Sequence, residues 1–86
     1  MENEFADKYE HLLVEERELT QKIATCEQCV TAVLSCIEQH SDSIHLHTVE
    51  DVVGLIHTIS SDLQTELLHL RLEKSVMTSK LHAVQL

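Results

Sequence analysis

Residues that break helices or shape turns are nearly absent from this sequence of 86 residues. It contains no proline and no tryptophan, one phenylalanine, one tyrosine, and a single glycine, Gly54. β-Sheet proteins need turn-forming residues every few positions, whereas helix formers fill most of this chain. These absences exclude a sheet protein and predict an all-α fold in a single domain over residues 1–86.

Positive charge is also missing from more than half of the chain. The net charge is −9, and residues 23–70 contain seven acidic residues but no lysine or arginine. Such a stretch cannot neutralise phosphate groups, and two aromatic residues offer little surface on which bases could stack. We therefore expect no nucleic-acid partner.

Long apolar runs are absent as well. No run approaches the ~20 residues that a membrane span needs, and the acidic start MENEFADKYE lacks the basic and apolar regions of a signal peptide. The three cysteines fit a reducing compartment. These features predict an intracellular protein, cytoplasmic or nuclear, without membrane insertion.

Apolar residues in the first half of the chain recur at alternating spacings of four and three, the heptad pattern of a coiled-coil helix. The pattern predicts a helix over about 3–40. From Cys26 onward more small and apolar residues flank it, so this part should contact several neighbouring helices. The seam consists of Phe5, Tyr9, Leu12, Glu16, Leu19, Ile23, Cys26, Val30, Val33 and Ile37.

The second half has an apolar residue at every seventh position, which predicts a helix over about 48–85. Thr48, with Asp51 three residues later, predicts the N-cap of this helix. Apolar residues on both flanks again indicate contacts with several helices. The heptad ridge consists of Val49, Ile56, Leu63, Leu70, Met77 and Val84.

The polar segment SDSIHLH, residues 41–47, predicts a loop between the two helices. In an antiparallel hairpin closed by this loop, the numbers of facing residues sum to about 89 or 90. This register matches the two seams, and it brings Glu16, the one acidic residue of its seam, opposite Lys74. We predict that Glu16 and Lys74 form a polar pair that sets the register.

A two-helix hairpin with faces this wide leaves much apolar surface in water, so we expect it to assemble into a bundle of four helices as a dimer. The chain is predicted to bind itself, helical protein partners, or both. The predicted interface consists of Leu19, Ile23, Cys26, Val30, Val33, Ile37, Val53, Ile56, Ile59, Leu63, Leu67, Leu70 and Met77.

The segment CEQCVTAVLSCIEQH, residues 26–40, resembles a zinc site at first sight. Zinc requires four ligands around one point, whereas Cys26 and His40 are fourteen residues apart, about 21 Å along a continuous helix. Cys26 is a seam residue, and free cysteine packs in cores as a small apolar side chain. We therefore predict no metal site and no cofactor.

Catalytic motifs are not apparent either. One glycine cannot form a phosphate-binding loop, and the acidic run at residues 15–18 is typical of a solvated helix face. Cys36 and His40 lie one turn apart, but a helical bundle gives such a pair no oxyanion donors and no substrate cleft. We expect neither an enzyme nor a small-molecule substrate.

These observations favour a structural or scaffolding subunit of a multiprotein assembly, of cytoskeletal, chromosomal or tethering type. A small adaptor that captures a single partner helix is the first alternative. A metal- or redox-responsive protein is the second, disfavoured by the distances between the potential ligands.

Overall fold

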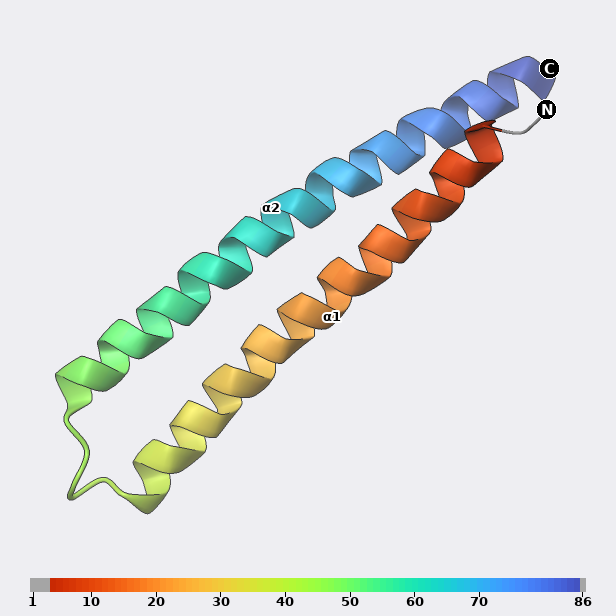
Figure 1. Ribbon diagram of the computed structural model, residues 1–86. Helices are drawn as coiled ribbons and strands as arrows, with labels where there is room; N and C mark the ends of the chain where they lie inside the picture. Colours follow the sequence, from red (N-terminus) through yellow and green to blue (C-terminus); the bar gives the residue numbers. More distant parts are fainter. Residues whose placement is uncertain (1–3, 86) are drawn as a thin grey trace.

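The chain forms two long antiparallel α-helices joined by a short loop (Figure 1). The computed structural model describes residues 4–85, with side chains to residue 81. Helix α1 spans Glu4–Gln39 and α2 spans Leu46–Gln85. The predicted all-helical hairpin is confirmed. The predicted first helical residue, Asn3, lies outside the described residues, as does the side chain of Val84.

Helix α2 begins two residues before the predicted start, so the prediction that Thr48 is its N-cap is wrong. His45 caps the helix instead. The backbone N–H of Thr48 donates to His45 Nδ1 at 3.2 Å, and the N–H of Val49 donates to the His45 carbonyl oxygen at 3.2 Å. The imidazole thereby satisfies one of the backbone donors that the first helical turn leaves without a partner.

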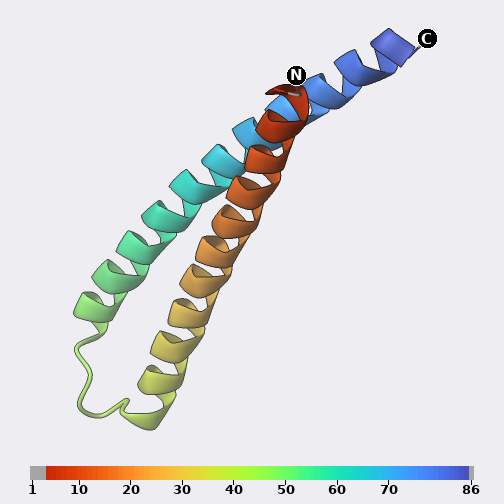
Figure 2. The same cartoon turned by 45° about the vertical axis from the view of Figure 1, so that its right-hand side comes forward.

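The hairpin is a thin rod. It measures 65 × 17 × 16 Å, and its radius of gyration is 19.4 Å, against about 12 Å for a compact chain of this length. Seen from a second direction, the helices again run alongside each other from the loop, the start of α1 overlaps α2, and the last turns of α2 project past it (Figure 2). Within residues 4–85, neither helix has a stretch long and apolar enough to cross a membrane.

Packing differs between the two ends of the rod. In the half away from the loop (residues 4–23 and 63–81, the terminal half), five apolar side chains are buried in one cluster, with Tyr9, Ile23 and Leu63 packed against it. Apolar seam residues nearer the loop (residues 24–39 and 46–62, the loop half) are only half-buried. The buried residues are Leu12, Leu19, Leu67, Leu70 and Met77.

Gly54 lies in the interior of α2, and its φ is not positive. A Cβ atom added there would meet nothing within 4 Å. We expect Gly54→Ala to raise the free energy of unfolding by about 0.5–1 kcal/mol, because alanine loses less conformational freedom on forming a helix. Urea titration followed by circular dichroism measures this. Unchanged or reduced stability would contradict the expectation that the glycine destabilises α2 at this position.

Candidate interaction site

Glu16 joins the two helices in the terminal half. Lys74 Nζ donates to its Oε1 at 2.6 Å, and Arg71 Nε donates to its Oε2 at 2.9 Å. The Glu16 side chain is 19% exposed, against 25% for Lys74 and 56% for Arg71. The structure thus brings the predicted pair together and adds a second cation.

The two cations change the acidity of this carboxyl group. The hydrogen bond from Lys74, followed by that from Arg71, holds the pKa of Glu16 below its ordinary value. Because the carboxylate is favoured in the folded state, its contribution to stability is complete above the unfolded-state pKa. This contribution is lost as the pH falls through the lower, folded-state pKa.

We expect Glu16→Gln to lower the free energy of unfolding by about 1 kcal/mol at pH 7, because the contacts are partly exposed to water. The difference from the unsubstituted chain should shrink as the pH is lowered below about 4.5. Urea denaturation at several pH values measures it, with Glu10→Gln, at an exposed position of the same helix, as control. A double-mutant cycle with Lys74→Met isolates the pairwise coupling. Zero coupling would contradict a role for this pair in setting the register.

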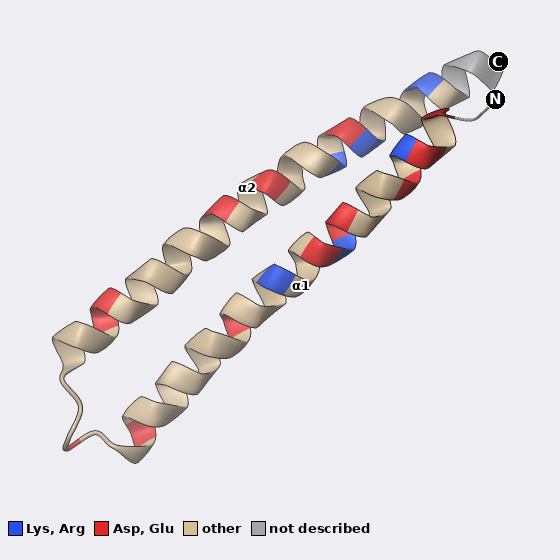
Figure 3. Cartoon of the chain, in the orientation of Figure 1, with Lys and Arg blue, Asp and Glu red and all other residues tan. Residues whose placement is uncertain are grey.

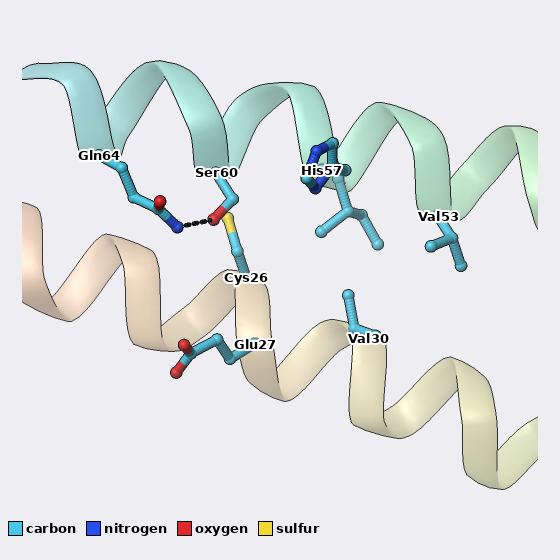
Figure 4. Close-up of a pocket in the computed structure, with 8 residues that line it drawn as sticks. Cys26, Glu27, Val30, Val53, His57, Ser60 and Gln64 are labelled. Carbon is cyan, nitrogen blue, oxygen red and sulfur yellow. Dashed lines mark hydrogen bonds between the residues drawn. The ribbon is translucent and has the colours of Figure 1, made fainter.

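A groove runs between the helices in the loop half (Figure 4). It has a volume of about 430 Å³ and is lined mainly by apolar atoms. Short side chains form part of its lining: Cys26 and Val30 on α1 face Val53 and Ser60 on α2, where the terminal half has leucines. Side chains this short cannot fill the space between two helices, so the groove stays open.

One side of the loop half is apolar and exposed. A second groove near the loop brings together Cys36 of α1 and Val52 of α2. Helical spacing places the other members of this surface one or two turns away on the same side of each helix. We call this surface the loop-proximal face; it consists of Cys29, Ala32 and Cys36 on α1 and Val52, Leu55 and Ile59 on α2, all exposed.

A second exposed apolar surface lies on α2 in the terminal half. Leu68, Leu72 and Val76 are 57%, 55% and 53% exposed. Their spacing of four residues aligns them along the helix, and none belongs to the buried cluster. We call them the outer stripe.

The predicted interface residues fall into three groups. Leu19, Leu67, Leu70 and Met77 are buried within the hairpin, and Ile23 and Leu63 pack against them. Ile59 is 55% exposed. The half-buried remainder is Cys26, Val30, Val33, Ile37, Val53 and Ile56. The hairpin therefore uses part of the predicted interface for its own core.

Sequence reasoning missed Arg71 as a partner of Glu16, although it precedes Lys74 by one helical turn. It also left Val52 and Leu55 out of the predicted interface. Their exposure depends on which side of α2 faces α1, and a heptad pattern alone resolves this poorly when apolar residues occur on several sides.

Cysteine and histidine side chains do not converge in the described part of the chain. No three histidine, cysteine, aspartate or glutamate side chains there are grouped so that they could hold a metal ion. Cys26 is half-buried in the seam, whereas Cys29 and Cys36 are exposed thiols. Helix α1 is continuous from Cys26 to Gln39.

Charge is distributed unevenly along the rod (Figure 3). The lysines and arginines lie in the terminal half, the one nearest the loop being Lys22 midway along α1, and among Lys, Arg, Asp and Glu only acidic residues occur in the described loop half. In the terminal half, Lys8 approaches Glu73 at 4.0 Å across the two helices.

Comparison of the sequence with known protein families and with curated proteins, and of the fold with solved structures, found no match.

Proposed function

We propose that this chain is a non-enzymatic structural subunit whose hairpin packs against further helices in a multiprotein assembly. The observation that carries the proposal is the presence of two separate exposed apolar surfaces, the loop-proximal face and the outer stripe. A contiguous exposed apolar patch commonly marks a protein-interaction site. Two such surfaces allow one hairpin to contact more than one neighbour, as a scaffold must.

The accessible surface supports the same proposal. The hairpin exposes 6740 Å², whereas a compact monomer of 9.8 kDa is expected to expose about 5,200 Å². The difference, roughly 1,500 Å², exceeds the ~800 Å² that each partner buries in a specific interface of standard size. Association would remove apolar surface that the hairpin alone leaves in water.

A second candidate function is that of an adaptor which captures one partner helix. The groove between Cys26 and Val30 on one side and Val53 and Ser60 on the other favours it, because an amphipathic helix can insert apolar side chains into such a groove. In this case the chain alone would be a monomer of low stability.

The mass of the purified chain in solution tests both proposals. A structural subunit that self-associates should have at least twice the monomer mass in light scattering coupled to size exclusion, together with high helicity by circular dichroism. A helical monomer whose melting temperature rises on addition of a partner would favour the adaptor. A stable monomer that binds no helical partner would contradict both.

A further inference from the structure

His45 caps α2 through its ring. The backbone N–H of Thr48 donates to His45 Nδ1 at 3.2 Å, and the Thr48 hydroxyl oxygen lies 2.8 Å from the same nitrogen. A backbone N–H is a donor only, so Nδ1 is the ring nitrogen without a proton. The capping ring is therefore the neutral imidazole with its proton on Nε2, and the hydroxyl also donates to Nδ1.

Protonation of this ring would remove the cap. An imidazolium has a donor at each nitrogen and no acceptor, so the Thr48 N–H would face another N–H. The ring also lies at the N-terminal end of α2, where the helix dipole disfavours positive charge. The capped state thus excludes a proton that a released His45 accepts, and falling pH favours release.

Neighbouring groups on α2 do not offset the charge of a protonated His45. The ring centroid of His47 lies 6.5 Å from that of His45, and this second ring can only add positive charge. Glu50 lies beside His47, with its Oε1 3.4 Å from His47 Nδ1. A protonated His47 would therefore have a carboxylate partner on its own helix.

Groups from α1 and the loop do not offset that charge either. Cys36 of α1 lines the same groove as His45, and a thiol carries no charge in weakly acidic solution. His40 and Asp42 are exposed in the loop. Among the described side chains, no carboxylate forms an ion pair with His45.

Packing does little to hold the first residues of α2 in the helix. Leu46 is 61% exposed, and the His47 side chain is 78% exposed. Thr48 is exposed as well, and Val49 is the first residue of α2 that is half-buried. An exposed helix end frays when its cap is lost, so residues 46–48 depend on His45.

We propose that His45 makes the start of α2 sensitive to pH. With the neutral ring, α2 begins at Leu46. With the protonated ring, residues 46–48 join the loop and α2 begins at Val49. Histidine titrates near neutral pH, so the change falls between neutral and weakly acidic solution. This inference is independent of the proposed function.

The sequence provides a cap for the second state. Thr48 is of a preferred N-cap type, and Asp51 stands three residues later, the position from which a capping-box side chain reaches back to the N-cap N–H. Release from His45 frees the Thr48 hydroxyl to accept a backbone N–H of the new first turn. The second groove would change as well, because its lining includes Ile44, His45 and Thr48. The loop end of the rod (Figure 1) would therefore present different surfaces in the two states.

Nuclear magnetic resonance of the full chain, labelled with ¹³C and ¹⁵N, tests this between pH 8 and pH 5.5, above the isoelectric point of about 5.0. At pH 8 the ¹⁵N shifts of the His45 ring should identify Nε2 as the protonated nitrogen. As that ring gains its second proton, the helical Cα shifts of Leu46 and His47 should fall by at least half, while that of Val53 stays unchanged. Loss of the cap and repulsion by the helix dipole should together lower the ratio of capped to released chain about five- to tenfold.

Variants at the two neighbouring histidines separate the cap from other effects of pH. His45→Asn supplies a preferred N-cap residue that does not titrate, so its α2 should begin at Leu46 at both pH values. His47→Asn, the matched control, should keep the pH response. His45→Ala should show the released state already at pH 8. All three positions of substitution are exposed, and circular dichroism should show that overall helicity is retained.

Three results would overturn the proposal. In the first, Leu46 and His47 keep their helical shifts at pH 5.5 although the His45 ring is protonated. In the second, His45→Asn responds to pH as the unsubstituted chain does. In the third, the His45 ring carries its proton on Nδ1 at pH 8, so that it cannot accept the Thr48 N–H.

Discussion

Val30→Asp combined with Leu63→Asp is expected to abolish helicity and association together. Both side chains lie half-buried between the helices, and Leu63 packs against the buried cluster. Two carboxylates there would lose water without gaining a partner and would also repel each other. We expect a combined loss of about 3–5 kcal/mol in the free energy of unfolding. Far-UV circular dichroism and light scattering at matched concentrations measure the two effects.

The matched control places the same charges where the hairpin is exposed. Val14 and Leu68 are 46% and 57% exposed, so Val14→Asp with Leu68→Asp should retain the helicity of the unsubstituted chain. If the variants with Asp at positions 30 and 63 kept both mass and helicity, the two helices would not meet in the described register.

Leu19→Ala is expected to lower the free energy of unfolding by about 2–4 kcal/mol, by loss of apolar burial and creation of a cavity. Leu19 is 7% exposed and belongs to a cluster of five buried side chains among residues 4–81. A hairpin with so small a core has few other contacts to compensate. Urea denaturation followed by circular dichroism gives the change in free energy.

Leu34→Ala is the control for this substitution. Leu34 is on the same helix but 54% exposed, so its truncation should cost less than about 0.5 kcal/mol. Equal losses for the two variants would contradict the concentration of the core in the terminal half.

Heptad spacing predicted both helices, and the short polar segment at residues 41–47 predicted their antiparallel pairing, because two helices joined by a short loop fold back along each other. The register in which facing residue numbers sum to about 89 or 90 also placed Glu16 opposite Lys74. In the structure, Lys74 Nζ donates to Glu16 Oε1 at 2.6 Å. The four-helix dimer stays a prediction.

Three features could not be derived from the pattern. The N-cap was misplaced because histidine is not among the usual capping residues, whereas Thr48 is of a preferred type. Arg71 lies beside the seam, and only its long side chain allows it to reach Glu16. Small side chains, among them Cys26 and Ser60, line the groove. A sequence pattern that classes residues only as apolar or polar takes no account of side-chain volume, so it could not predict the groove.

The uneven packing of the rod has a mechanical consequence. Because α1 begins and α2 ends at the same end (Figure 1), a force pulling Glu4 and Gln85 apart would peel the helices open one layer at a time. The force needed to separate the helices would be greatest at the beginning, in the terminal half, where Leu12, Leu19 and Met77 are buried. Half-buried layers nearer the loop would offer less resistance once those are separated. A force large enough to separate the buried layers would therefore exceed what the layers nearer the loop resist, and these would follow in rapid succession.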